Sequence, residues 1–234
     1  MIKELGYHKT PLGDLTLRVR PEPRLNIDEV YEVKLGDEYL MSSLFTEGEK
    51  KLAKIGLEGI EGEIDVVVGG LGLGYTAAAA LEFENVRSLL VIDLFQEVID
   101  WHLEKLVPLG ERLSADRRCE MRCGDFFELA KTGLDSSDPE RKFDAVLLDI
   151  DHSPRHYLDK KNESFYGKEG LELLRRQLKP KGVFALWSDD PPDEKFTDHL
   201  ASVFGSAEAH EIEFKNPYTQ RTSVNSVYKA VKTQ

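Results

Sequence analysis

The stretch Ile64-Asp-Val-Val-Val-Gly-Gly-Leu-Gly-Leu-Gly74 decides the fold of this chain, together with the alanine-rich residues 75–81 that follow it. The β-branched run 64–68 predicts a short buried strand, and the alanine-rich run predicts a helix. The glycines between them let the backbone turn sharply and approach a ligand closely. A strand, a glycine-rich turn and a helix in this order are typical of α/β proteins that bind nucleotides or nucleosides.

The same alternation continues downstream and predicts the rest of the sheet. Further strands are expected at 88–92, 118–123, 143–148, 182–187, 209–214 and 223–231, and helices at 96–106, 171–178 and 194–204. Alternating strands and helices indicate a mostly parallel sheet covered on both faces. Asn216-Pro217 marks a turn between the last two strands. We therefore expect an α/β, Rossmann-like fold with a seven-stranded sheet and an antiparallel C-terminal edge hairpin.

Residues 1–60 differ from this pattern and predict a small β-rich N-terminal domain before a donor-binding domain at 61–234. Residues 15–20 and 30–35 alternate apolar and polar side chains, and Gly36-Asp37 turns the chain into 38–41. Such alternation is typical of a half-buried antiparallel sheet. Thr46 and Glu49 then have the spacing of a capping box for a short helix that ends near Gly56.

Composition excludes several classes of protein. The 234 residues carry 43 Asp and Glu against 31 Lys and Arg, a formal net charge of −12. This balance disfavours nucleic acid, which basic surfaces bind. The sequence has no apolar run of the roughly 20 residues that a membrane span needs, and its N-terminus lacks the apolar segment of a signal peptide. Two cysteines make no disulfide framework. We expect a cytoplasmic protein without nucleic-acid or membrane partners.

The predicted strands end in glycine or aspartate, and these residues are the first candidates for a ligand site. Ligands of such sheets bind beyond the carboxyl ends of the strands. The glycine loop (residues 69–74) offers Gly69, Gly70, Gly72 and Gly74 to a donor molecule. The alternative is a tight turn without a ligand. The spacing Gly72-x-Gly74-x-x-Ala77 also fits the dinucleotide fingerprint, which keeps a dehydrogenase as a distant possibility.

Aspartates at the next two strand ends extend this candidate site. Asp93 could accept hydrogen bonds from both hydroxyls of a ribose. Asp125 could accept from an adenine amino group, with Phe126 against the adenine ring. For each aspartate the alternative is a helix N-cap, with Phe126 and Phe127 in the core. Three motifs follow one another at successive strand ends: the glycine loop, Asp93 and Gly124-Asp125-Phe126. Together they favour a nucleoside sulfonium as the ligand over a dinucleotide.

The fourth strand end supplies the candidate catalytic groups. Asp149 and Asp151 could align an amine and remove its proton, and an amine attacking a sulfonium needs little more. His152 and His156 are alternative bases, and Tyr166 could close over the site. The alternative for the Asp and His residues is an ordinary surface loop, and the alternative for Tyr166 is a packing role. Cys119 and Cys123 lack the further ligands that a metal site needs, so we expect no metal.

These motifs resemble those of the spermidine synthase (polyamine aminopropyltransferase) family. The glycine loop matches the glycine loop of that family. Residues 93–99 match the family's helix start, which begins with an acid. Residues 143–149 match the strand that ends in the family's catalytic Asp, which is Asp149 here. Residues 164–185 match the helix and strand that come next. The resemblance implies a class I S-adenosylmethionine-dependent fold and a transferase of polyamine biosynthesis. Its donor is S-adenosylmethionine or the decarboxylated form, its substrate a small amine or polyamine, and we expect a homodimer.

The sequence departs from the family pattern where the donor tail and the polyamine would bind. Gly72 stands at the place of an Asp that helps to hold the aminopropyl donor, and Asp151-His152 changes the segment after the catalytic Asp. The family's Tyr-Gln/Glu motif and its Gln-Gly-Glu are missing; 38–43 and 187–192 stand in their places. We expect aminopropyl transfer to a small amine. The alternatives are methyl transfer to a small molecule and a non-catalytic nucleoside-binding homologue.

Overall fold

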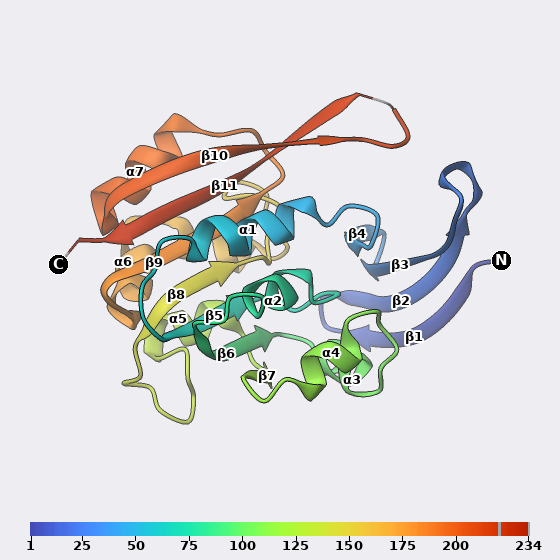
Figure 1. The fold of residues 1–234 in the computed structure, drawn as a ribbon, viewed down its shortest axis with the longest axis horizontal. Helices are drawn as coiled ribbons and strands as arrows, with labels where there is room; N and C mark the ends of the chain where they lie inside the picture. Colours follow the sequence, from blue (N-terminus) through green and yellow to red (C-terminus); the bar gives the residue numbers. More distant parts are fainter. Residues whose placement is uncertain (220, 234) are drawn as a thin grey trace.

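The computed structural model, which describes residues 1–219 and 221–233, contains the expected seven-stranded sheet (Figure 1). The strand order is β10-β11-β9-β8-β5-β6-β7, and only β11 runs antiparallel to the others. The C-terminal hairpin is confirmed, with β10 at the edge and β11 beside β9. The strands are β5 (Ile64–Gly69), β6 (Val86–Asp93), β7 (Cys119–Cys123), β8 (Phe143–Leu148), β9 (Leu178–Ser188), β10 (Gly205–Lys215) and β11 (Thr222–Lys232).

Helices cover both faces of this sheet, because alternate side chains of its central strands point to opposite sides. Val66 and Val68 pack in one core with the first four helices, and Val67 packs in the other with the last three. The strand β5 is buried throughout, as expected for a central parallel strand. The helices are α1 (Glu47–Leu57), α2 (Tyr75–Ala80), α3 (Gln96–Leu103), α4 (Gly110–Ala115), α5 (Phe126–Thr132), α6 (Lys168–Gln177) and α7 (Glu194–Phe204), with 3-10 turns at Pro23–Leu25 and Lys160–Tyr166.

The N-terminal region forms an antiparallel sheet in the order β1-β2-β3-β4. Its inward side chains, such as Leu17 and Val33, join the same core as α1 to α4. At Gly6 a Cβ would lie 2.5 Å from the indole Nε1 of Trp101, so the glycine lets α3 pack closely. The strand β1 was not predicted. The strands are β1 (Lys3–Thr10), β2 (Gly13–Glu22), β3 (Ile27–Leu35) and β4 (Glu38–Ser42).

The β10–β11 hairpin extends past the main sheet towards the N-terminal sheet (Figure 1). Tyr218 in the loop at its tip donates a hydrogen bond of 2.8 Å from its hydroxyl to Glu22 Oε2 of β2. Arg20 links the same Glu22, at 2.8 Å, to the nearly inaccessible Glu32 of β3, at 2.9 Å. These four residues line a groove between the N-terminal sheet and the hairpin.

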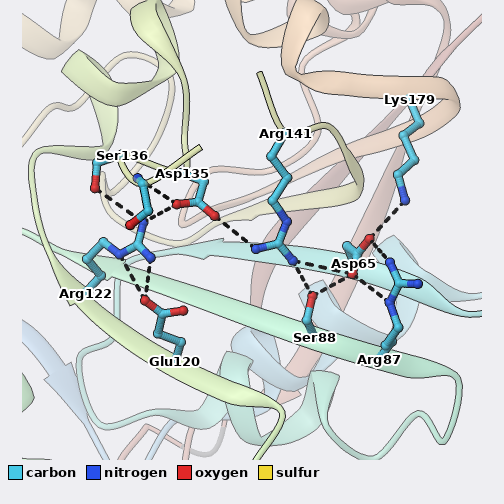
Figure 2. Close-up of polar contacts among 10 residues, drawn as sticks. Asp65, Arg87, Ser88, Glu120, Arg122, Asp135, Ser136, Arg141 and Lys179 are labelled. Atoms are coloured by element: carbon cyan, nitrogen blue, oxygen red, sulfur yellow. Dashed lines mark hydrogen bonds and ion pairs between the residues drawn. The ribbon is translucent and has the colours of Figure 1, made fainter. Parts of the chain in front are cut away.

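Ion pairs connect the starts of β5, β6 and β9 (Figure 2). Asp65, 4% exposed, accepts from Arg87, Ser88 and Lys179. Burial opposes ionisation, but these hydrogen bonds outweigh it and hold the pKa of Asp65 well below its usual range. Arg141 joins this group to Asp135. Burial opposes ionisation of Asp135, but hydrogen bonds from Arg122 and Arg141 outweigh it and lower its pKa to about 2. The network stabilises the edge of the sheet opposite the candidate site.

Candidate functional site

A cavity of about 150 Å³ lies at the carboxyl ends of the central strands. Most of the predicted site residues line it; these are Gly70, Gly72, Asp93, Asp125, Phe126, Asp149 and His152. Apolar side chains of the N-terminal sheet cover its other side; these are Leu12, Val33, Leu35, Leu40 and Met41. Four predicted residues do not line the cavity but lie behind the residues that do, and support them by packing or hydrogen bonds; these are Gly69, Gly74, Asp151 and Tyr166. The cavity is therefore built by both sheets.

The glycine loop is shaped by contacts that only glycine permits. At Gly70 the backbone φ is +95°, and a Cβ would lie 2.1 Å from the carbonyl oxygen of Asp149. At Gly69 a Cβ would meet the ring of Phe126 at 2.7 Å. The loop can pass between β8 and α5 only because these side chains are absent.

Asp93 fixes the loop from the end of β6. Its Oδ2 accepts from Leu71 N at 2.9 Å, and its Oδ1 accepts from Phe95 N at the same distance. Burial raises the pKa of Asp93, while the backbone donors oppose that rise. The helix α3 begins after Phe95, so Asp93 is not its N-cap residue. Asp93 also lines the cavity, where its carboxylate can accept a hydrogen bond from a ligand.

Two residues that sequence reasoning missed hold the loop at Gly72. Met41 Sδ of β4 accepts from Leu73 N at 2.9 Å and would lie 2.8 Å from a Cβ on Gly72. From the other side, His102 Nε2 lies 3.0 Å from the Gly72 carbonyl oxygen. Burial lowers the pKa of His102, so its ring is neutral and Nε2 carries the proton. Because both residues look like ordinary packing groups, the sequence carried no signal of these contacts.

Asp125 has a double role at the next strand end. Its Oδ1 accepts from Phe127 N at 3.0 Å and caps α5, as the alternative interpretation expected. Its Oδ2 accepts from Lys161 Nζ, also at 3.0 Å, and the carboxylate still borders the cavity. Phe126 is buried, in an edge-to-face contact with Phe165. The capping role and the cavity lining thus coexist.

Asp149 follows β8 and faces the cavity. Its Oδ2 accepts from the Thr76 hydroxyl of α2 at 2.7 Å. Burial raises the pKa of Asp149 above its ordinary value, against the effect of that hydrogen bond. Glu49 of α1 lines the same cavity, and burial followed by the negative charge of Asp149 raises its pKa as well. A carboxylate with a raised pKa at a cavity is suited to take a proton from an amine.

Glu49 was noticed in the sequence only as part of a capping box. The predicted helix and its N-cap residue Thr46 are confirmed, but the capping box is wrong, because the Thr46 side chain makes no capping hydrogen bond. The first turn of α1 instead directs Glu49 towards Asp149, and Trp187 packs against Gly48, where a Cβ would lie 2.3 Å from its Nε1. The sequence carried no signal of this position, because only the packing of α1 against the main sheet brings Glu49 to the cavity.

Asp151 and Tyr166 lie together behind the cavity wall. The buried Asp151 accepts from the Tyr166 hydroxyl at 2.9 Å, from Asn162 Nδ2 at 3.0 Å and from Leu158 N at 2.7 Å. Burial raises the pKa of Asp151, and these donors oppose the rise. Asp151 thereby holds residues 158–166 against the cavity. His152 is different, because it lines both the cavity and the neighbouring groove.

The groove, of about 1190 Å³, adjoins the cavity between the N-terminal sheet and the β10–β11 hairpin. Cavity and groove share Leu40, Met41, Glu49, His152 and Trp187. Asp189, which follows β9, also lines the groove. Within residues 1–219 and 221–233 the structure shows no group of three or more His, Cys, Asp or Glu placed to hold a metal ion. In the same ranges, no helix is long and apolar enough to cross a membrane.

Known structures share this fold. A spermidine synthase in complex with the transition state analogue AdoDATO aligns with a TM-score of 0.76 at 16% identity, covering 98% of this chain and 74% of that one. Spermidine synthase from Thermotoga maritima aligns with a TM-score of 0.75 at 16% identity, covering 98% and 73%. The fold is therefore of the class I methyltransferase-like type, with an N-terminal antiparallel sheet, as predicted.

Residues 49–203 match the family model of the spermine/spermidine synthase domain, and the chain belongs to that family. The polyamine aminopropyltransferase of Oceanobacillus iheyensis is 25% identical over 134 residues, which cover 56% of this chain and 24% of that protein. The polyamine aminopropyltransferase of Prochlorococcus marinus is 27% identical over 126 residues, covering 54% and 40%. The matches span less than half the length of these curated relatives. The predicted family is confirmed.

Proposed function

We propose that this protein is a transferase that alkylates a small amine with a sulfonium donor, by aminopropyl transfer from decarboxylated S-adenosylmethionine. The observation that carries the proposal is the position of Asp149, whose carboxylate faces the same cavity as the glycine loop and Asp93. Family membership and the structural similarity to a spermidine synthase bound to AdoDATO support this choice of reaction. A polyamine such as putrescine is the corresponding acceptor.

Each site residue has a role in this proposal. The glycine loop and Asp93 bind the ribose side of the donor, and Asp125 with Phe126 binds the adenine. Asp149 orients the acceptor amine and takes its proton, while His152 contacts the acceptor where the cavity meets the groove. Asp151 and Tyr166 hold the segment that covers the adenine side. Displacement at a sulfonium has a good leaving group, so alignment and proton removal are the main tasks of the protein.

One observation favours a different donor tail. Gly72 stands where the resemblance places an Asp that helps to hold the aminopropyl group, and Met41 is the side chain beside it; neither can carry a negative charge. S-adenosylmethionine as donor, with methyl transfer to a small molecule, is the second candidate. A non-catalytic nucleoside-binding homologue is the third. A homodimer, a cytoplasmic location and the domain boundary near residue 60 stay predictions.

Turnover assays distinguish these functions. We expect the protein to form a new amine from putrescine and decarboxylated donor, detected by mass spectrometry, and to bind methylthioadenosine at micromolar concentration in calorimetry. Methyl transfer from S-adenosylmethionine to an amine panel, without aminopropyl transfer, would support the second candidate. Nucleoside binding without any turnover would support the third. If methylthioadenosine and S-adenosylhomocysteine both fail to bind, all three are excluded.

A further inference from the structure

Lys161 and Asp125 form an ion pair on the wall of the cavity. The Nζ of Lys161 donates to Oδ2 of Asp125 at 3.0 Å, and both residues line the cavity. Asp125 precedes α5, whereas Lys161 lies in the 3-10 turn Lys160–Tyr166, so the pair brings an acceptor and a donor together from two segments. The proposed adenine site uses the carboxylate alone, but the ammonium group beside it borders the same ligand.

The two carboxylate oxygens of Asp125 have different tasks. Oδ1 accepts from Phe127 N at 3.0 Å and from Glu128 N at 3.3 Å, which fixes the carboxylate at the start of α5. Within the described residues, Oδ2 accepts from Lys161 alone. An ionised carboxylate oxygen can accept two hydrogen bonds. Oδ2 can therefore accept from a ligand in the cavity and keep its contact with Lys161.

The ammonium group of Lys161 is also only partly engaged. It has three N–H groups, and one of them donates to Asp125. Its second acidic neighbour, Asp159 Oδ2, lies 3.6 Å away, which is too long for a strong hydrogen bond. The hydrogen bond to Asp125 raises the pKa of Lys161, so the group stays charged at neutral pH. At least one N–H of Lys161 is therefore available to a ligand.

The surroundings of this pair suit a flat ring with a polar edge. Phe126, Phe127 and Leu158 line the same cavity. In nucleobase sites, apolar side chains contact the faces of the ring and polar groups bind its edge. A carboxylate alone can only accept, so it favours a base with an amino group and repels a carbonyl oxygen. A carboxylate beside an ammonium group offers an acceptor and a donor to the same edge.

We propose that Lys161 and Asp125 together bind the edge of the purine base, and that the site accepts 6-oxopurine nucleosides as well as adenine nucleosides. Adenine presents its amino group to Asp125 and a ring nitrogen to Lys161. A 6-oxopurine presents its carbonyl oxygen to Lys161 and its ring N–H to Asp125. This inference rests on the proposed nucleoside donor, and it identifies Lys161 as the residue that widens the choice of base.

The exposure of Lys161 separates this role from the stability of the fold. Its side chain is 48% exposed, and an ion pair at such a site contributes little to folding. Asp151 holds the same segment through Asn162 and Tyr166, whichever side chain stands at position 161. Replacing Lys161 should therefore change the choice of ligand more than the structure of the cavity wall.

Calorimetry with methylthioadenosine and methylthioinosine, which carry an amino and an oxo group at the same carbon, tests the pair. We expect the unmodified protein to bind both, with dissociation constants within about tenfold of each other. In Lys161→Met both ligands lose one hydrogen bond, but only methylthioinosine then places a carbonyl oxygen beside an unneutralised carboxylate. The preference for methylthioadenosine should therefore rise roughly tenfold.

Two further variants control this comparison. Lys161→Arg keeps a charged donor and should keep the ratio of the unmodified protein. Lys160→Met changes the neighbouring exposed lysine, which lies outside the cavity lining, and is the matched control. The expected result is a Lys161→Met protein that melts like this control and discriminates more strongly between the two bases.

The other outcomes separate this inference from the proposed function. If Lys161→Met weakens both nucleosides equally, or binds both like the control, Lys161 does not contribute to the choice of base and the inference is overturned. Binding of methylthioadenosine without methylthioinosine by the unmodified protein would overturn it as well, with the proposed donor site intact. If the unmodified protein binds neither nucleoside, the proposed donor site is excluded and the inference is excluded with it.

Discussion

His102 Nε2 of α3 lies 3.0 Å from the carbonyl oxygen of Gly72, directly beneath the glycine loop. The ring is fully buried, and its Nδ1 has no hydrogen-bond partner within the described residues. A carbonyl oxygen can only accept, so Nε2 donates and Nδ1 keeps its lone pair. Protonation would add a charge that nothing in this core offsets. His102 therefore acts as a neutral positioning residue for the loop.

His102→Phe should lower the free energy of unfolding by about 1–2 kcal/mol, because the Gly72 carbonyl loses its buried donor. The same change should weaken nucleoside binding several-fold. Since burial lowers the pKa of His102 below 6.5, the unfolded chain binds more protons at acidic pH. The contribution of His102 is thus fully present above about pH 6.5 and is lost as pH falls. Urea unfolding at several pH values should show this slope only in the unmodified protein.

Asp65→Asn should destabilise the fold without changing the candidate site. Asp65 pairs with Arg87, Lys179 and Arg141 at the starts of the strands (Figure 2). Removing its charge leaves these cations without their partner and should cost about 2 kcal/mol, less than a fully buried pair because the cations are partly exposed.

The pKa of Asp65 is lowered in the folded state, so this stabilisation is present above about pH 4 and is lost as pH falls further. Thermal melts between neutral and acidic pH measure it. Glu61→Gln is the control, because that side chain is exposed and forms no ion pair with Arg87, Lys179 or Arg141. Equal acid sensitivity of Asp65→Asn and the unmodified protein would contradict the prediction.

Asp125→Ala should combine a loss of stability with a loss of nucleoside binding. The Oδ1 atom caps α5, and replacing such a cap by alanine costs about 1 kcal/mol. Asp125→Asn keeps the capping oxygen and should restore most of this stability. It removes the charge that pairs with Lys161, however, so the segment 158–166 should be less protected in hydrogen exchange. If Asn and Ala unfold alike, the cap contributes nothing.

The periodic parts of the fold were predictable, and the short elements were not. The strands β5 and β8 are continuous apolar runs, and α7 begins at an acidic cap, so each carries its own local signal. The strand β1 and the helix α4 were missed, and α5 was expected only in the alternative interpretation that Asp125 caps a helix. The charged and polar side chains of β1 lie largely exposed, and α4 and α5 are too short to show a helical period.

The sequence predicted those residues of the candidate site that directly follow a predicted strand. Asp93, Asp125 and Asp149 each follow a predicted strand, and parallel strands bring their ends to one edge. Glu49 and Met41 could not be found in this way. They come from outside the alternating units, and only tertiary packing brings them to the cavity.

Gly72→Asp alone should destabilise the fold. Combined with Met41→Ala, it should recover part of that stability and strengthen the binding of the donor. The φ of Gly72 is +48°, a left-handed conformation that Asp tolerates better than most residues. The obstacle is Met41 Sδ, 2.8 Å from the position of a Cβ, and this atom also accepts the Leu73 N–H. The single variant should therefore unfold at lower temperature, whereas the double variant regains part of the loss. With room for its carboxylate, the double variant should bind a donor with an ammonium tail more tightly than the unmodified protein. Calorimetry with decarboxylated S-adenosylmethionine measures that preference, with methylthioadenosine as the tail-less control. A gain equal for both ligands would show that Gly72 does not face the donor tail.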